Sequence, residues 1–324
     1  MKMSARKSVC LAVQLTACAL LLALSLEAQE TQPGIHLPTN WRVGEKYRIN
    51  VVKEKIGADG TNDFTGNATV QFELRQRSDD GYLFVWTVSQ TDNGHVNGHV
   101  KGAADALESL ADMLGVEDLR IELRTNRAGQ PIQIVNLDDI VAHSRSRIDQ
   151  LAVSPNKKIA REAKKYLEEE FRPEKLAEVG LGNADIFYLA CGASFLREGE
   201  TVNRDDNSGS IPAKITFGLS EVRRDAGEAV IAYTRVTDST KLNAALADKF
   251  AQNRREAARM GFCRNGCPNP ESMPKYEIEE RATYVMDLKT GWPNSVIYEW
   301  EAKVGGKRHE LNRTTLTRIE TQQQ

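Results

Sequence analysis

The chain has 324 residues, of which 40% are hydrophobic and 27% charged, and its net charge at pH 7 is −2. Such a balanced charge gives no electrostatic footprint for nucleic acid or another polyanion, so neither is expected as a partner. The length supports a sizeable hydrophobic core. No repeat, long linker or low-complexity tract divides the sequence.

The first residues have the pattern of an export signal. A basic start with Lys2 and Lys7 precedes an apolar run from Val9 to Leu26, and the small residue Ala28 follows. This order is typical of a cleaved signal peptide, so the sequence predicts a signal over residues 1–28. The mature chain would then be periplasmic or secreted, without a transmembrane span.

Two alternatives for this segment stay open. The run from Val9 to Leu26 is long enough to remain as a membrane anchor. The stretch Leu15-Thr-Ala-Cys18 also resembles the lipobox at which bacterial lipoproteins are cut and acylated, which would anchor the protein through a lipidated Cys18.

Beyond the signal, alternation of apolar and polar residues dominates the chain. Period-two patterns separated by Gly, Asn and Asp turns predict antiparallel hairpins, each with one face in water. The hairpin regions are 46–90, 119–134, 211–236 and 276–319. The strands at both ends of the chain carry one polar face, so we expect them to complete a single sheet.

Helical periodicity occurs between these hairpins. Apolar residues recur at i, i+3, i+4 and i+7, which predicts amphipathic helices. The segments are 103–114, 137–151, 154–171, 174–179 and 240–260. The predicted fold class is therefore α+β, with a curved antiparallel sheet and helices that are inserted between hairpins and packed on one face. Residues 29–324 would form one domain, with an alternative lobe boundary near 153–156.

Three cysteines remain after removal of the signal. Cys263 and Cys267 flank a tight Asn-Gly turn, and an oxidising compartment favours a disulfide between them. A redox-active pair or a zinc site fits less well, because the C-x3-C spacing has no second ligand pair. Cys191 lies in an apolar stretch and is interpreted as a buried core thiol.

No motif indicates a catalytic, metal or cofactor site. His95 and His99 would stand about 13 Å apart on a strand, too far for one metal ion. The oxygen-rich loops 59–63 and 204–209 lack the final glutamate of a calcium-binding loop. We therefore expect no metal and no cofactor. An enzyme would have to use Cys191, His143 and acidic clusters such as Glu277, Glu279 and Glu280.

Three short stretches resemble a family of exported bacterial β-rich proteins without an assigned activity. They are Trp41-Arg-Val-Gly-Glu-Lys-Tyr47, Arg124-Thr-Asn-Arg-Ala-Gly-Gln-Pro-Ile132 and Met286-Asp-Leu-Lys-Thr-Gly-Trp-Pro293. The order of hairpins and helices is also similar to envelope lipid and lipoprotein carriers. The resemblance implies a β-rich fold and export, and it supplies no active-site residue.

The function favoured by these patterns is non-enzymatic binding of a lipid-like or other hydrophobic ligand in the envelope. Leu107, Leu110 and Leu114 form the apolar stripe that would line the pocket. The alternative is an envelope interaction or assembly module that docks an envelope protein on an edge strand such as Asp63–Leu74. A second alternative is an enzyme with an unrecognised site.

Overall fold

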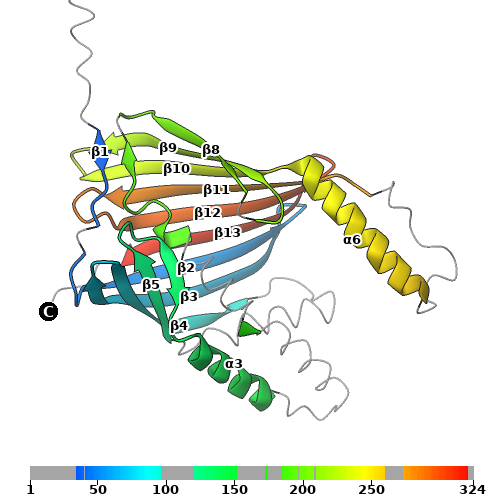
Figure 1. The fold of residues 1–324 in the computed structure, drawn as a ribbon, viewed down its shortest axis with the longest axis horizontal. Coiled ribbons are helices and arrows are strands. Elements are labelled where there is room, and N and C mark those ends of the chain that lie inside the picture. Colours follow the sequence, from blue (N-terminus) through cyan, green and yellow to red (C-terminus); the bar gives the residue numbers. More distant parts are fainter. Residues whose placement is uncertain are drawn as a thin grey trace, which may run out of the picture.

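The structure is a computed structural model, and its main element is one antiparallel sheet of 11 strands. The order of the strands is β6-β5-β4-β3-β2-β13-β12-β11-β10-β9-β8 (Figure 1). The structure describes residues 34–39, 41–95, 120–151, 172–173, 184, 186–195, 197–207, 209–259 and 273–319.

The strands have the following bounds: β2 Lys46–Gly57, β3 Asn62–Ser78, β4 Gly81–His95, β5 Arg120–Asn126, β6 Pro131–Ile134, β8 Thr201–Asp206, β9 Ala213–Arg223, β10 Glu228–Thr237, β11 Tyr276–Asp287, β12 Pro293–Val304 and β13 Lys307–Ile319. The predicted hairpins are confirmed. The single sheet is confirmed as well, because β2 pairs with β13. In this ladder Arg48 lies opposite Ile319 at one end, and Gly57 lies opposite Glu310 at the other. That ladder joins two runs of consecutive hairpins.

The prediction of an α+β fold is wrong, because strands dominate the described residues. Two helices have the predicted spans, α3 at Leu137–Leu151 and α6 at Ser239–Arg259. Both are inserted between hairpins, but Figure 1 shows that they extend away from the sheet and do not cover a face. The periodicity predicted a less polar side of each helix, but it could not identify the surface against which that side packs. Among the α6 residues whose side chains are described, 239–252 and 254–255, only Leu242 is buried.

Two short segments, and not the helices α3 and α6, cover one end of the sheet. A two-stranded ladder of β1 (Ile35–His36) and β7 (Ser194–Phe195) lies at one end of the strands, and residues 186–195 lead into it. We call residues 34–39 and 41 the clasp. The clasp is tied to the segment before β7 by a hydrogen bond from Leu37 N to Ala193 O, 2.9 Å long.

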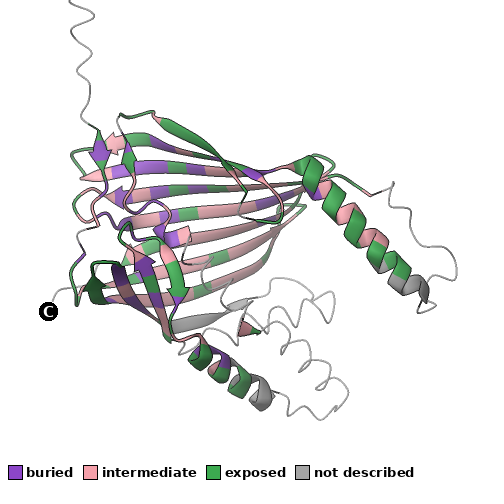
Figure 2. Ribbon diagram, viewed as in Figure 1, coloured by how far each residue is buried: buried purple, intermediate pink, exposed green. Residues whose placement is uncertain are grey.

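Aromatic rings fill the space between the sheet and these segments. Trp41 is fully buried and stacks on Trp292 with a centroid distance of 4.2 Å and an interplanar angle of 21°. Phe187 makes an edge contact with Phe72 of β3 at 5.2 Å. Buried positions are concentrated toward this end of the strands (Figure 2). We call the sheet face that bears this cluster the inner face and the opposite one the outer face.

Candidate functional site

The three stretches that resemble exported proteins converge on the clasp, although they are far apart in the sequence. The indole Nε1 of Trp41 donates to Thr290 O at 3.0 Å. A Cβ at Gly129 would lie 2.5 Å from the Trp41 ring, and a Cβ at Gly291 would lie 1.8 Å from Pro38 O. These residues therefore serve packing at one end of the sheet.

Side chains of the asparagine and aspartate at the turns explain why the chain bends there. Asn126 Oδ1 accepts hydrogen bonds from the N–H groups of Ala128 and Gln130, both 2.9 Å long. Asp287 Oδ1 accepts from the N–H groups of Lys289 and Thr290 at 2.8 and 3.1 Å. Such local acceptors stabilise turns, and they present the following glycines to the clasp.

The inner face changes from apolar to polar along the strands. Next to the aromatic cluster, one cross-strand row is completely apolar apart from a tyrosine hydroxyl: Leu219, Ile231, Tyr284, Val296, Leu316 and Val51. The next row is mixed: Phe217, Tyr233, Ala282, Tyr298, Thr314 and Lys53. The third row is mostly polar: Ile215, Arg235, Glu280, Trp300, Asn312 and Lys55. A surface graded in this way can contact an apolar chain and a polar group at once.

On β2, β13 and β12 these three rows are less buried than on β9, β10 and β11. We call six residues on β2, β13 and β12 the shelf: Val51, Lys53, Tyr298, Trp300, Thr314 and Leu316. Lys53 is exposed, and the other five are half-buried. Direct cross-strand neighbours such as Lys53 and Thr314 have Cβ atoms about 5 Å apart. The shelf therefore brings aliphatic, aromatic, hydroxyl and ammonium groups together on one surface.

Beside the shelf, a charged cluster crosses β8, β10 and β11. Arg235 donates to Asp206 Oδ2 at 3.0 Å and to Glu280 Oε1 at 2.6 Å. Burial alone lowers the pKa of the Arg235 guanidinium, but these two hydrogen bonds outweigh it and raise that pKa. The Tyr298 hydroxyl donates to Glu280 Oε2 at 2.8 Å. Burial, with the Glu280 charge, raises the pKa of Tyr233 to about 12, so this phenol stays neutral.

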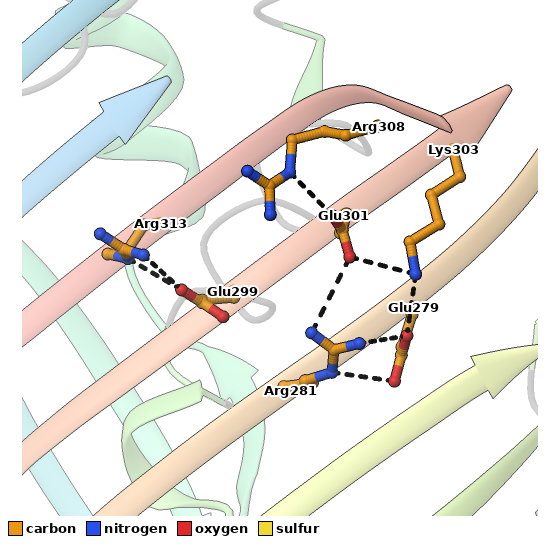
Figure 3. Close-up of polar contacts among 7 residues, drawn as sticks. All are labelled: Glu279, Arg281, Glu299, Glu301, Lys303, Arg308 and Arg313. Atoms are coloured by element: carbon orange, nitrogen blue, oxygen red, sulfur yellow. Dashed lines mark hydrogen bonds and ion pairs between the residues drawn. The ribbon is translucent and has the colours of Figure 1, made fainter. Parts of the chain in front are cut away.

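The outer face carries a separate network of ion pairs (Figure 3). Glu301 is only 6% exposed, and Arg308 Nε donates to its Oε1 at 2.8 Å. Lys303 lies 3.4 Å from its other oxygen, and Arg281 lies 3.8 Å from that oxygen. Along the next row, Arg313 pairs with Glu299 at 2.8 Å and with Glu54 at 3.7 Å. Opposite charges alternate here, so the charged groups of the network pair with one another.

We expect Glu301→Gln to remove part of the dependence of stability on pH. Burial would raise the pKa of the Glu301 carboxyl, but the Arg308 hydrogen bond and the Lys303 charge outweigh it and lower that pKa. A lowered folded-state pKa contributes stability above the unfolded pKa of about 4.3, and this is lost as the pH falls through the folded value. Urea unfolding of both proteins at about pH 7 and about pH 3 should show a smaller acid loss for the variant.

The control for this experiment is Glu277→Gln. Glu277 is an exposed outer-face residue on β11, and its carboxylate forms no ion pair with a described residue. That variant should keep the acid dependence of the unaltered protein. An identical acid loss in all three proteins would contradict the role given to Glu301.

Two shallow pockets open on the outer face. One of about 220 Å³ lies over β2 to β5 and is lined by Lys46, Glu73, Arg75 and Arg120 among others. Glu73 pairs with Lys46 at 3.6 Å and with Arg75 at 3.2 Å, so these charges neutralise one another in part. The other, of about 170 Å³, lies beside Glu301 and the start of α6. Among the described residues, no hydrogen bond joins a hydroxyl of either pocket to a carboxylate.

Several predicted site residues lie outside the described residues. These are the apolar stripe Leu107, Leu110 and Leu114, the cysteines Cys18, Cys263 and Cys267, and residues 1–28. The helix at 154–171 and the imidazole of His99 also fall there. The disulfide, the signal and the apolar stripe therefore stay predictions.

The enzyme alternative receives no support from its described residues. Cys191 is buried as predicted, its thiol contacts Gly291 O at 3.6 Å, and burial strongly raises its thiol pKa. A thiol of this kind is a poor nucleophile at neutral pH. Of the acidic cluster, Glu279 faces outward to Arg281 while Glu280 faces inward to Arg235. Alternation along β11 separates these two carboxylates.

A serine and a histidine meet in the β1–β7 ladder. His36 Nδ1 lies 2.7 Å from Ser194 Oγ, and both side chains are exposed. Within the described ranges no carboxylate hydrogen bonds to this histidine. The pair closes the ladder and does not form a catalytic triad of described residues. The described chain also contains no cluster of three or more His, Cys, Asp or Glu placed to hold a metal ion.

The edge-strand prediction for Asp63–Leu74 is wrong. These residues belong to β3, which pairs with β2 on one side and β4 on the other. The edges of the sheet are β6 and β8. In the part of the chain that the structure describes, no helix is both long and apolar enough to cross a membrane.

Comparison with known proteins identifies no family, because no protein-family profile and no curated protein gives a significant match. One similar solved structure is an exported protein with a YmcC-like fold from Bacteroides fragilis, with 9% identity and a TM-score of 0.22 over 89% of this chain and 100% of that one. Another is an outer membrane channel from Pseudomonas putida F1, with 10% identity and a TM-score of 0.22 over 87% and 97%. Scores this low carry no argument about activity or location.

Proposed function

We propose that the protein is an exported, non-enzymatic binding protein that holds a lipid-like ligand on the inner face of its sheet. The observation that supports this proposal is the gradient of the inner face, which passes from an apolar row to a polar row over a few residues. An amphiphilic ligand has the same division into an apolar chain and a polar head.

The shelf offers suitable contacts for such a ligand. Val51 and Leu316 continue the buried apolar row, yet both are half-buried and can contact a hydrocarbon chain. Tyr298 and Trp300 are half-buried aromatic side chains on the neighbouring strand. Aromatic rings with one polar end are suited to the boundary between apolar and wet surroundings. Polar groups at few positions then fix the orientation of the ligand.

We expect Leu316→Gln to weaken the binding of a neutral apolar probe. N-phenyl-1-naphthylamine becomes fluorescent in apolar surroundings, and titration with the full chain gives its dissociation constant. Loss of one buried aliphatic side chain costs about 1.5 to 3 kcal/mol of apolar contact, which corresponds to roughly tenfold weaker binding or more. The contact itself is half-buried, so an effect near tenfold is expected.

The matched control is Thr317→Gln, which places the same side chain on the outer face of β13, one residue away. It should bind the probe as the unaltered protein does. The proposal would be overturned if the protein did not bind the probe, or if both variants lost binding equally. Native mass spectrometry of protein from its own envelope fraction would add the mass of any retained ligand.

The second candidate function is a module that binds an envelope protein. Its docking strand would be β8 instead of Asp63–Leu74. β8 is an edge of the sheet, and its first five residues are exposed, with Val202 at 49%. An edge of this kind can accept an extended segment through main-chain hydrogen bonds. A complex that survives native mass spectrometry without a lipid-sized adduct would favour this function.

A further inference from the structure

We propose that the ligand of the shelf is an anionic amphiphile, with its carboxylate or phosphate head at Lys53 and its chain along Val51 and Leu316. This inference rests on the proposed function and adds the chemical class of the head group. It is carried by the distribution of charge on the inner face.

Most charges near the shelf already have partners. Arg235 is held between Asp206 and Glu280 at 3.0 and 2.6 Å. Lys55 lies 3.7 Å from Glu310, whose Oε1 also accepts a hydrogen bond from the Asn312 side chain at 2.8 Å. The trio of Arg235, Asp206 and Glu280 carries a net charge of −1, and Lys55 and Glu310 neutralise each other, so none of these groups offers a free cation to a ligand.

Lys53 differs from them. It points to the same side of β2 as Val51 and the buried Ile49, yet its side chain is exposed. No described residue forms an ion pair with it. An ammonium group in this setting gives the shelf a local charge of one positive unit.

The cross-strand neighbours of Lys53 supply an aromatic ring, which packs over a glycine, and a hydroxyl. Directly across on β3 is Gly66, which has no side chain, and the Phe64 ring lies 3.0 Å from the position of a Cβ there. Directly across on β13 is Thr314, whose hydroxyl can donate a hydrogen bond to an anion. An ammonium, a hydroxyl and an aromatic ring thus surround one point of the sheet.

The distances fit a chain that begins at this point. Residues two apart on one strand are about 6.7 Å apart, so Val51 lies within the reach of the first methylenes of a ligand whose head is at Lys53. Leu316 is directly opposite Val51. Along the inner face, the surface therefore becomes more apolar from Lys53 toward Val51 and the buried row. An anionic amphiphile has the same order of a charged head and an apolar chain.

The experiment compares head groups at constant chain length. Dodecanoate, dodecyl phosphate and dodecyltrimethylammonium, each below its micelle concentration, and dodecanol, below its solubility limit, displace N-phenyl-1-naphthylamine from the full chain. We expect the two anions to displace the probe best. Lys53→Gln should weaken their binding about fivefold, because a solvated charge contact contributes on the order of 1 kcal/mol, while dodecanol binding stays unchanged.

Two control variants sharpen the result. Lys53→Arg should keep the preference for anions, and Lys214→Gln, which removes an exposed lysine from β9, should have no effect. A preference between dodecanoate and dodecyl phosphate would identify which anion the site takes. Equal displacement by all four head groups, or preference for the trimethylammonium compound, would overturn this inference while leaving the proposed function intact. Absence of probe binding would instead remove the proposed function.

Discussion

Trp41→Ala should lower the free energy of unfolding by about 3 to 5 kcal/mol, as large-to-small replacements of buried aromatic residues do. The Trp41 side chain is fully buried, and its ring lies 5.0 Å from Tyr82, 5.4 Å from Phe84 and 4.2 Å from Trp292. Its indole nitrogen also donates to Thr290 O. Alanine would leave a cavity and an unpaired carbonyl at once. Urea unfolding followed by circular dichroism measures the loss.

The control for Trp41→Ala is Val43→Ala. Val43 is 59% exposed and lies two residues further along, so its replacement should change stability by less than about 0.5 kcal/mol. Trp41→Phe should fall between the two, because it keeps an aromatic ring and loses the hydrogen bond. A Trp41→Ala protein as stable as Val43→Ala would show that the clasp does not hold the sheet.

Gly291→Ala should be strongly destabilising, with a loss of about 3 kcal/mol or more. Gly291 has a φ of +71°, which costs a residue with a Cβ about 1 to 2 kcal/mol. In addition, that Cβ would lie 1.8 Å from the carbonyl oxygen of Pro38, a backbone atom in the clasp. The clasp must therefore move away, and the Trp41 ring moves with it. The same unfolding experiment gives the value.

Gly227→Ala separates the two causes. Gly227 has a φ of +68°, and nothing lies within 4 Å of a Cβ placed there. It has the backbone strain of Gly291 without the clash, so its replacement should cost only about 1 to 2 kcal/mol. If the two variants lost equal stability, the close approach of Pro38 would contribute nothing.

Most of the sheet could be predicted from the sequence. Alternation and turn residues located the hairpins, and the polarity of the terminal strands predicted that they share one sheet, as the β2–β13 ladder shows. These features are local, since period two and Gly-containing turns are properties of neighbouring residues. The spans of α3 and α6 were predicted on the same grounds. Their placement was not, because amphipathic periodicity does not determine a partner surface.

The candidate site could not be predicted, because it depends on register. Lys53 and Thr314 are adjacent only through the β2–β13 ladder, and Arg235 meets Glu280 only through the β10–β11 ladder. A shift of one residue in either ladder would place these side chains on the other face. Their alternation with apolar neighbours indicated a face, while the cross-strand partners come from pairings far apart in the chain. The sequence alone therefore directed attention to clusters such as Glu277, Glu279 and Glu280, whose members point to both faces.

The position of β13 also determines when the 11-stranded sheet can form. This strand is synthesised after every other described strand, yet it lies between β2 and β12 in the middle of the sheet. Until it arrives, the two hairpin runs have unpaired edges facing each other, each a template for pairing with another chain. Contacts between such distant segments give a high contact order and slow folding. A chaperone that shields β2 and β12 during this interval would protect the nascent protein from aggregation.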